Sequence, residues 1–118
     1  MRGDLGGGVI AAAGALCGAL GVALAARGSH LAEANLSIAA NFLLMHAPAL
    51  IVVGLLARSR WGRLSGWILL AGLVLFAGDL SARSLLNAPL FPFAAPLGGA
   101  GLMTGWASLA LAFLLRRA

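Results

Sequence analysis

Three polar side chains that could do chemistry, Asn41, His46 and Asp79, lie in otherwise apolar stretches of this sequence, and a fourth, Arg83, directly follows the stretch that holds Asp79. Imidazole and carboxylate groups relay protons, bind ligands or hold cations, and ionisable groups inside a membrane span commonly mark such sites. These four residues are therefore the candidate intramembrane site of the chain.

Asp79 has a structural and a functional interpretation. Arg83 follows four residues later, one helical turn away on the same face, so a local ion pair is the structural interpretation. A site for a solute, a proton or an intermolecular partner is the functional one. Pro96 suits the first turn of a helix whose N-terminal N–H groups would give the carboxylate a second partner.

His46 lies near the middle of its apolar stretch. A neutral imidazole hydrogen-bonded to a backbone carbonyl is the structural interpretation, and a proton relay, a ligand site or haem ligation are the alternatives. The other histidine, His30, lies about 15 Å away along the membrane normal, which disfavours a bis-histidine haem. Asn41 shares a helical face with Pro48 and is a candidate near the bend that the proline favours.

The chain shows no pattern typical of an enzyme. Its single cysteine, Cys17, excludes an intramolecular disulfide and a multi-cysteine metal site. No nucleophile, general-base or phosphate-loop motif is recognisable. We therefore expect no catalytic residues, no metal site, no cofactor and no enzymatic activity.

The elements that must position these residues follow from composition. The 118 residues are 62% hydrophobic and include eight Arg and three acids, too few charges for a soluble surface and too much apolar surface for a disordered chain. Uncharged stretches of membrane-spanning length cover residues 9–26, 36–57, 64–82 and 97–115. The sequence predicts one all-α domain over residues 1–118, an integral membrane four-helix bundle with antiparallel, up-and-down connections.

The arginines predict the orientation of this bundle. Six lie on the side of the two termini and the second link, and two lie on the other side. The first group is Arg2, Arg58, Arg60, Arg63, Arg116 and Arg117, and the second is Arg27 and Arg83. Both termini should face the cytoplasm of a bacterial inner membrane. The bias disfavours a dual-topology exporter, and the scattered basic residues disfavour nucleic-acid binding.

Small residues recur at alternating spacings of three and four in the first and fourth spans. Such stripes allow helix backbones to approach closely. We expect the tightest helix contacts at the glycines of these stripes, which include Gly14, Gly18, Gly21, Gly101 and Gly105.

Several ordered segments resemble a known family. They are Gly14–Leu24 with Gly28–His30, then His46–Leu50, Leu75–Gly78, Ala95–Gly99 and Gly105–Trp106. Their order and spacing resemble the small four-helix inner-membrane proteins called domain of unknown function 423, relatives of eukaryotic transmembrane protein 256, over nearly the whole chain.

The resemblance implies a fold and an inner-membrane location, and it implies no reaction. The chain has Phe42–Leu43 where the family usually shows Tyr-Gln, and Ala77–Leu80 where it shows Ser-Gly-Ser-Leu. These differences remove polar groups beside His46 and introduce the charge of Asp79.

The leading functional hypothesis is a non-enzymatic membrane protein that acts through lateral contacts, as a small accessory or lipid-interacting subunit. Its expected partners are membrane lipids, with a larger membrane complex or a homo-oligomer as further options. The alternative is a small-solute or proton transporter or channel that uses Asp79 and His46. A haem or quinone carrier is a third hypothesis.

Overall fold

A computed structural model describes residues 6–31 and 33–115 of the chain. These residues form four helices and no strand: α1 (Gly7–Leu31), α2 (Ala34–Leu56), α3 (Arg60–Leu85) and α4 (Ala94–Leu114). The helices have 21 to 26 residues, a length of about 32 to 39 Å that suffices to cross a bilayer core. The predicted all-α bundle is confirmed.

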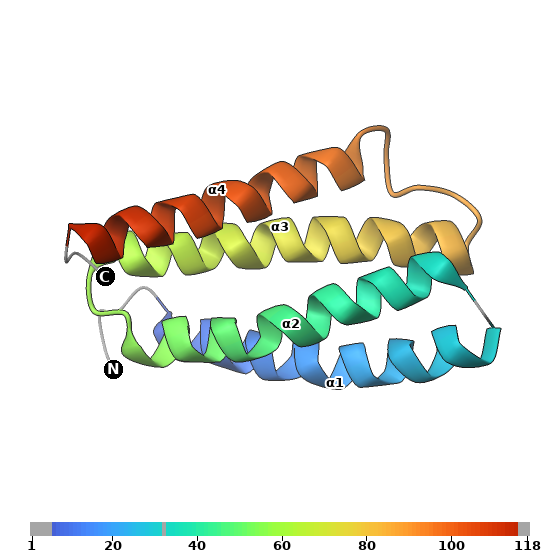
Figure 1. Ribbon diagram of the computed structural model, residues 1–118, viewed down its shortest axis with the longest axis horizontal. Coiled ribbons are helices and arrows are strands. Elements are labelled where there is room, and N and C mark those ends of the chain that lie inside the picture. Colours follow the sequence, from blue (N-terminus) through green and yellow to red (C-terminus); the bar gives the residue numbers. More distant parts are fainter. Residues whose placement is uncertain (1–5, 32, 116–118) are drawn as a thin grey trace.

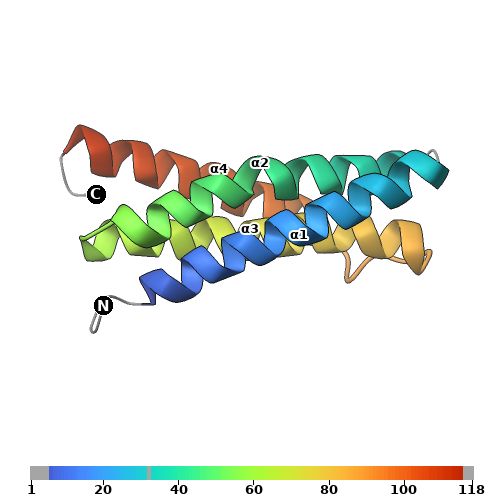
Figure 2. The ribbon, with the colours of Figure 1, turned by 90° about the horizontal axis from the view of Figure 1, so that it is seen from below.

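The helices form two hairpins that pack side by side. Successive helices run antiparallel along a molecule of 43 × 26 × 22 Å, and α1 begins at the end where α4 finishes (Figure 1). The most extensive contacts join α1 to α2 and α3 to α4, and α2 with α3 connects the two hairpins. The second view shows α1 inclined relative to α3 (Figure 2).

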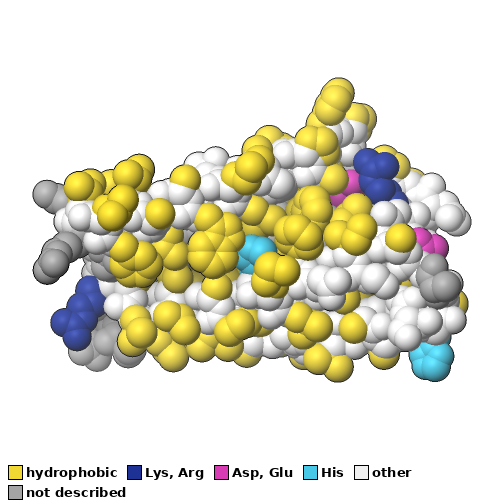
Figure 3. Space-filling view, viewed as in Figure 1, with side chains coloured by type: hydrophobic (Ala, Val, Ile, Leu, Met, Phe, Trp, Pro, Cys, Tyr) yellow, Lys and Arg dark blue, Asp and Glu magenta, His cyan; other side chains and the backbone are white. Residues whose placement is uncertain are grey.

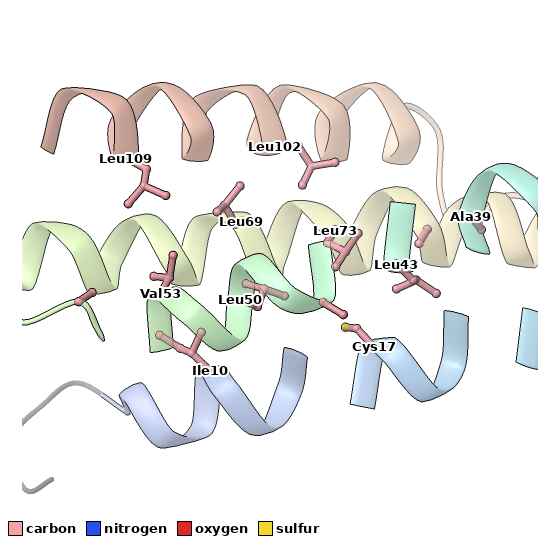
Figure 4. Packing of buried hydrophobic residues seen from close by; sticks show 13 residues of the cluster. Ile10, Cys17, Ala39, Leu43, Leu50, Val53, Leu69, Leu73, Leu102 and Leu109 are labelled. Atoms are coloured by element: carbon pink, nitrogen blue, oxygen red, sulfur yellow. The ribbon is translucent and has the colours of Figure 1, made fainter. Parts of the chain in front are cut away.

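Branched apolar side chains fill the space between the hairpins. Leu50 and Val53 of α2 lie between Ile10 of α1 and Leu69 of α3 (Figure 4). All four side chains are buried. Because lipid is as apolar as these side chains, this layer stabilises the bundle mainly through close packing.

Glycine contacts hold each hairpin together. A Cβ atom added at Gly54 would lie 2.5 Å from the Gly7 carbonyl oxygen, and one added at Gly98 would lie 2.5 Å from the Phe76 nitrogen. Gly72 faces Gly98 across the α3–α4 contact. The helix backbones therefore touch where a side chain would separate them.

The glycines selected from the sequence differ in how closely they are packed. An added Cβ would lie 2.7 to 2.9 Å from atoms of a neighbouring helix at Gly14, Gly21 and Gly105. The same distance is 3.2 Å at Gly101, which is still tighter than most Cβ contacts, and 3.5 Å at Gly18, which is ordinary van der Waals contact. Gly18 thus leaves room for a methyl group, and the stripes are not uniformly tight.

Local signals set where α3 and α4 begin. The Ser59 hydroxyl accepts a hydrogen bond of 2.9 Å from the Gly62 amide and caps α3. Helix α4 begins at Ala94, so that Pro96 lies within its first turn, where a missing N–H costs nothing.

Candidate functional site

Asp79 forms an ion pair inside the bundle. Its side chain has no exposed surface, and its Oδ2 accepts a hydrogen bond of 2.8 Å from Arg83 Nε. The Arg83 side chain remains 41% exposed. Figure 3 shows an acidic and a basic side chain together near the end of the molecule that lies away from the termini.

The second carboxylate oxygen of Asp79 fixes the position of the link between α3 and α4 through a hydrogen bond. Asp79 Oδ1 accepts a hydrogen bond of 2.9 Å from the backbone amide of Leu90, and the amide of Ala95 in the first turn of α4 lies nearby. The sequence predicted a second partner for this carboxylate at the start of the fourth helix. The start of α4 supplies such a partner in the Ala95 amide, and the link that folds back over α3 adds the Leu90 amide, which makes the stronger bond.

His46 joins α2 to α4. Its side chain is 3% exposed. Nδ1 lies 2.8 Å from the Phe42 carbonyl oxygen, and the Trp106 indole N–H donates to Nε2 over 3.0 Å. A carbonyl only accepts and an indole only donates, so these partners specify a neutral imidazole with its proton on Nδ1. Both ring nitrogens are therefore engaged within the protein.

A groove runs past His46 between α2 and α4, and we call it the α2–α4 groove. Its volume is about 400 Å³. Aromatic and sulfur-containing side chains dominate its lining, which comprises Phe42, Met45, His46, Phe76, Gly99, Leu102, Met103 and Trp106. Figure 3 shows a histidine near the middle of this face, surrounded by hydrophobic side chains.

Asn41 lies apart from the other candidates. It is exposed on the outer surface of α2, whereas His46 and Asp79 are buried. The structure therefore brings Asp79 and Arg83 together, gives His46 a separate set of partners, and leaves Asn41 on the surface.

A third polar contact was not anticipated from the sequence. Trp61 Nε1 donates to Ser108 Oγ over 2.8 Å, and the Ser65 and Ser108 hydroxyls are 2.7 Å apart. Ser108 lies three residues after Gly105 and so continues the small-residue stripe of the fourth span, and this spacing was the signal for it in the sequence. Within residues 6–31 and 33–115, no group of three His, Cys, Asp or Glu side chains could hold a metal ion.

These features define a class of protein. Four helices are long and apolar enough to cross a membrane. The polar residues buried in the described part of the bundle, His46, Ser65 and Asp79, bond to other side chains or to backbone, as a bilayer requires. The chain is a multi-pass membrane protein of the cell membrane. It belongs to the family described as "Protein of unknown function (DUF423)", which matches residues 17–99.

Relatives in several bacteria support this assignment. A UPF0382 membrane protein of Haemophilus influenzae is 34% identical, over 86% of this chain and 87% of the relative. The UPF0382 membrane protein YwdK of Bacillus subtilis is 30% identical, over 84% and 90% respectively. A relative in Staphylococcus haemolyticus is 30% identical, over 81% and 87%. No solved structure matches significantly. The resemblance seen in the sequence is confirmed.

Proposed function

We propose that this protein is non-enzymatic and acts through lateral contacts within the bilayer, as a small accessory or lipid-interacting subunit. The α2–α4 groove is the observation that carries the proposal. It lies beside the midpoint of α2 and is lined almost entirely by apolar side chains. Such a surface accommodates a hydrocarbon chain or an apolar helix and offers little to a hydrated solute.

The bonding of the polar groups favours this role over transport. Asp79 and His46 each have their hydrogen-bonding atoms occupied by partners in the same chain. Asp79 is not among the residues that line the groove at His46. Transport of a proton or small solute through these two residues remains the alternative, and it would require both sets of bonds to open.

The proposed orientation has both termini in the cytoplasm of a bacterial inner membrane. Arg58, Arg60 and Arg63 lie around the link between α2 and α3, at the end where α1 begins. Arg27 and Arg83 lie toward the other end of the bundle. The predicted orientation also rests on Arg2, Arg116 and Arg117, which are outside the described residues. Basic residues favour the cytoplasmic side.

A pair of glycine substitutions tests the groove. Gly99 lines it, and a Cβ added there has no atom within 4 Å, so Gly99→Leu would occupy the groove without a backbone clash. Gly8 is equally open but does not line the groove, which makes Gly8→Leu the matched control. We expect phospholipid to co-purify with the parent and the control in mild detergent, as detected by native mass spectrometry, and to be reduced in Gly99→Leu.

Equal lipid retention by all three proteins would contradict a lipid site in the groove. A proton or ion flux in proteoliposomes that depends on Asp79 would contradict the non-transport assignment. Affinity purification in the same detergent identifies any larger complex, and its loss in Gly99→Leu alone would place the accessory contact at the groove.

A further inference from the structure

One face of α2 is exposed along most of the length of the helix, and only Met45 and Val52 of this face border hollows that α4 also lines. The residues of this face recur at spacings of three and four, which is the heptad spacing by which two parallel helices pack against each other. All are exposed, and together we call them the α2 seam: Ile38, Asn41, Met45, Pro48, Val52 and Leu55. The buried residues of α2, such as Leu43 and Leu50, lie on the opposite side of the helix.

Asn41 is the polar residue of the α2 seam. It is exposed, and its side chain has no hydrogen-bond partner among the described residues. Asn41 is the eighth residue of α2, about 10 Å along the helix from its first residue. Its short side chain cannot extend to the headgroups as Lys and Arg do. A polar amide at this depth requires a partner that the monomer does not supply.

A second copy of the chain supplies that partner. Copies inserted in the same orientation are related by a two-fold axis along the membrane normal, so each residue near the axis meets its own counterpart at the same depth. An amide has both a donor and an acceptor, and two Asn41 side chains therefore satisfy each other. A fatty-acid chain offers neither group.

We propose that the chain forms a parallel homodimer through the α2 seam, with the two Asn41 amides hydrogen-bonded across the two-fold axis. A single Asn within a heptad seam fixes the register and number of helices. Met45 belongs both to the α2 seam and to the lining of the α2–α4 groove, so the dimer covers one edge of that groove. The dimer does not depend on what the groove binds.

Disulfide cross-linking in membranes tests the geometry. In a Cys17→Ala background, which removes the native thiol, Val52→Cys is expected to form a covalent dimer of twice the 11.8 kDa chain. Ala12→Cys is the matched control, because Ala12 is exposed at a similar distance from the same end of the bundle but lies on α1. No cross-link at Val52, or equal cross-linking at Ala12, would overturn the proposal.

Substitutions at Asn41 test the amide pair. Asn41→Leu is expected to weaken dimerisation in lipid bilayers about tenfold, measured by single-molecule photobleaching across a range of dilutions, because it removes about two interhelical hydrogen bonds. Asn41→Gln retains the amide and should restore association. Helix content and melting temperature of Asn41→Leu should equal those of the parent monomer, because the exposed Asn41 side chain has no hydrogen bond to lose among the described residues.

Unchanged dimerisation of Asn41→Leu would overturn the amide pair. A parent that stays monomeric at all dilutions would overturn the dimer and assign the α2 seam to lipid or to another protein. Gly99→Leu should dimerise like the parent, which separates this result from the outcome at the groove.

Discussion

At the scale of single residues, the buried polar side chains form hydrogen bonds that connect different segments of the chain. Asp79 connects α3 to the link that follows it, through Arg83 on one side and the Leu90 amide on the other. His46 connects α2 to Trp106 of α4. In the absence of water such bonds are costly to leave unmade, so their first effect is to fix positions. Their functional role beyond this stays a prediction.

The two partners of Asp79 predict an order of tolerance. Asp79→Asn keeps an oxygen that accepts from the Leu90 amide, whereas Arg83→Leu leaves the buried carboxylate without its cation. We expect Arg83→Leu to lower the melting temperature in detergent more than Asp79→Asn does. The opposite order would mean that the carboxylate is held mainly by the link.

The ion pair of Asp79 could be predicted from the sequence, whereas the hydrogen bond of His46 to α4 could not. The spacing of Asp79 and Arg83 indicates a shared helical face without knowledge of the fold. The bond between His46 and Trp106 joins residues 60 positions apart, and it depends on how α2 and α4 are rotated about their axes. The exposure of Asn41 could not be predicted either. The residues directly before and after it are all apolar, so the sequence does not reveal which face of the helix meets lipid.

At the scale of helices, the fold depends on where backbones touch. The four spans could be predicted because hydrocarbon admits only segments that satisfy their own hydrogen bonds. Gly54 and Gly72 were not predicted as contacts, although both lie against the backbone of a neighbouring helix. Gly54 is the only glycine of α2, and Gly72 lies six residues from both Gly66 and Gly78, so neither has another glycine at the spacing of three or four that defines a stripe. Where two helices touch depends on both of their surfaces, so the residue pattern of one helix does not by itself predict the contact positions.

Two adjacent glycines test this account of the α3–α4 contact. A methyl group at Gly98 would lie 2.5 Å from the Phe76 nitrogen, whereas one at Gly99 has no atom within 4 Å. Gly98→Ala should force the helices apart and lower the melting temperature. Gly99→Ala should leave it unchanged or raise it slightly, because Ala is the better helix former by about 1 kcal/mol. Equal melting temperatures of the two variants would show that the backbones of α3 and α4 are farther apart at Gly98 than the structure has them.

At the scale of the whole molecule, two glycine-packed hairpins meet through a layer of branched side chains. The up-and-down connections place the link between α2 and α3 at the end opposite the link between α3 and α4. The number of spans and their alternation could be predicted from length and hydropathy. The side of the membrane on which each link lies depends on the arginines and is a separate prediction.

Thiol labelling in intact cells measures that orientation. In a Cys17→Ala background, a cysteine at Ser59 should be protected from an impermeant reagent, and a cysteine at the exposed Leu86 should react. The physical basis is the excess of Arg on the side of the α2–α3 link. Labelling at Ser59 with protection at Leu86 would reverse the assigned topology, and labelling at both positions would indicate copies in two orientations.

The ion pair of α3 also bears on how the bundle responds to the voltage across a living membrane. A voltage exerts force on a net charge within the bilayer in proportion to that charge. Asp79 and Arg83 carry opposite charges at atoms 2.8 Å apart, so the field meets a small dipole at this level and no net charge. The pair can therefore be held within the bilayer without making the fold sensitive to voltage, and we expect this part of the bundle to keep the same shape in energised and de-energised cells.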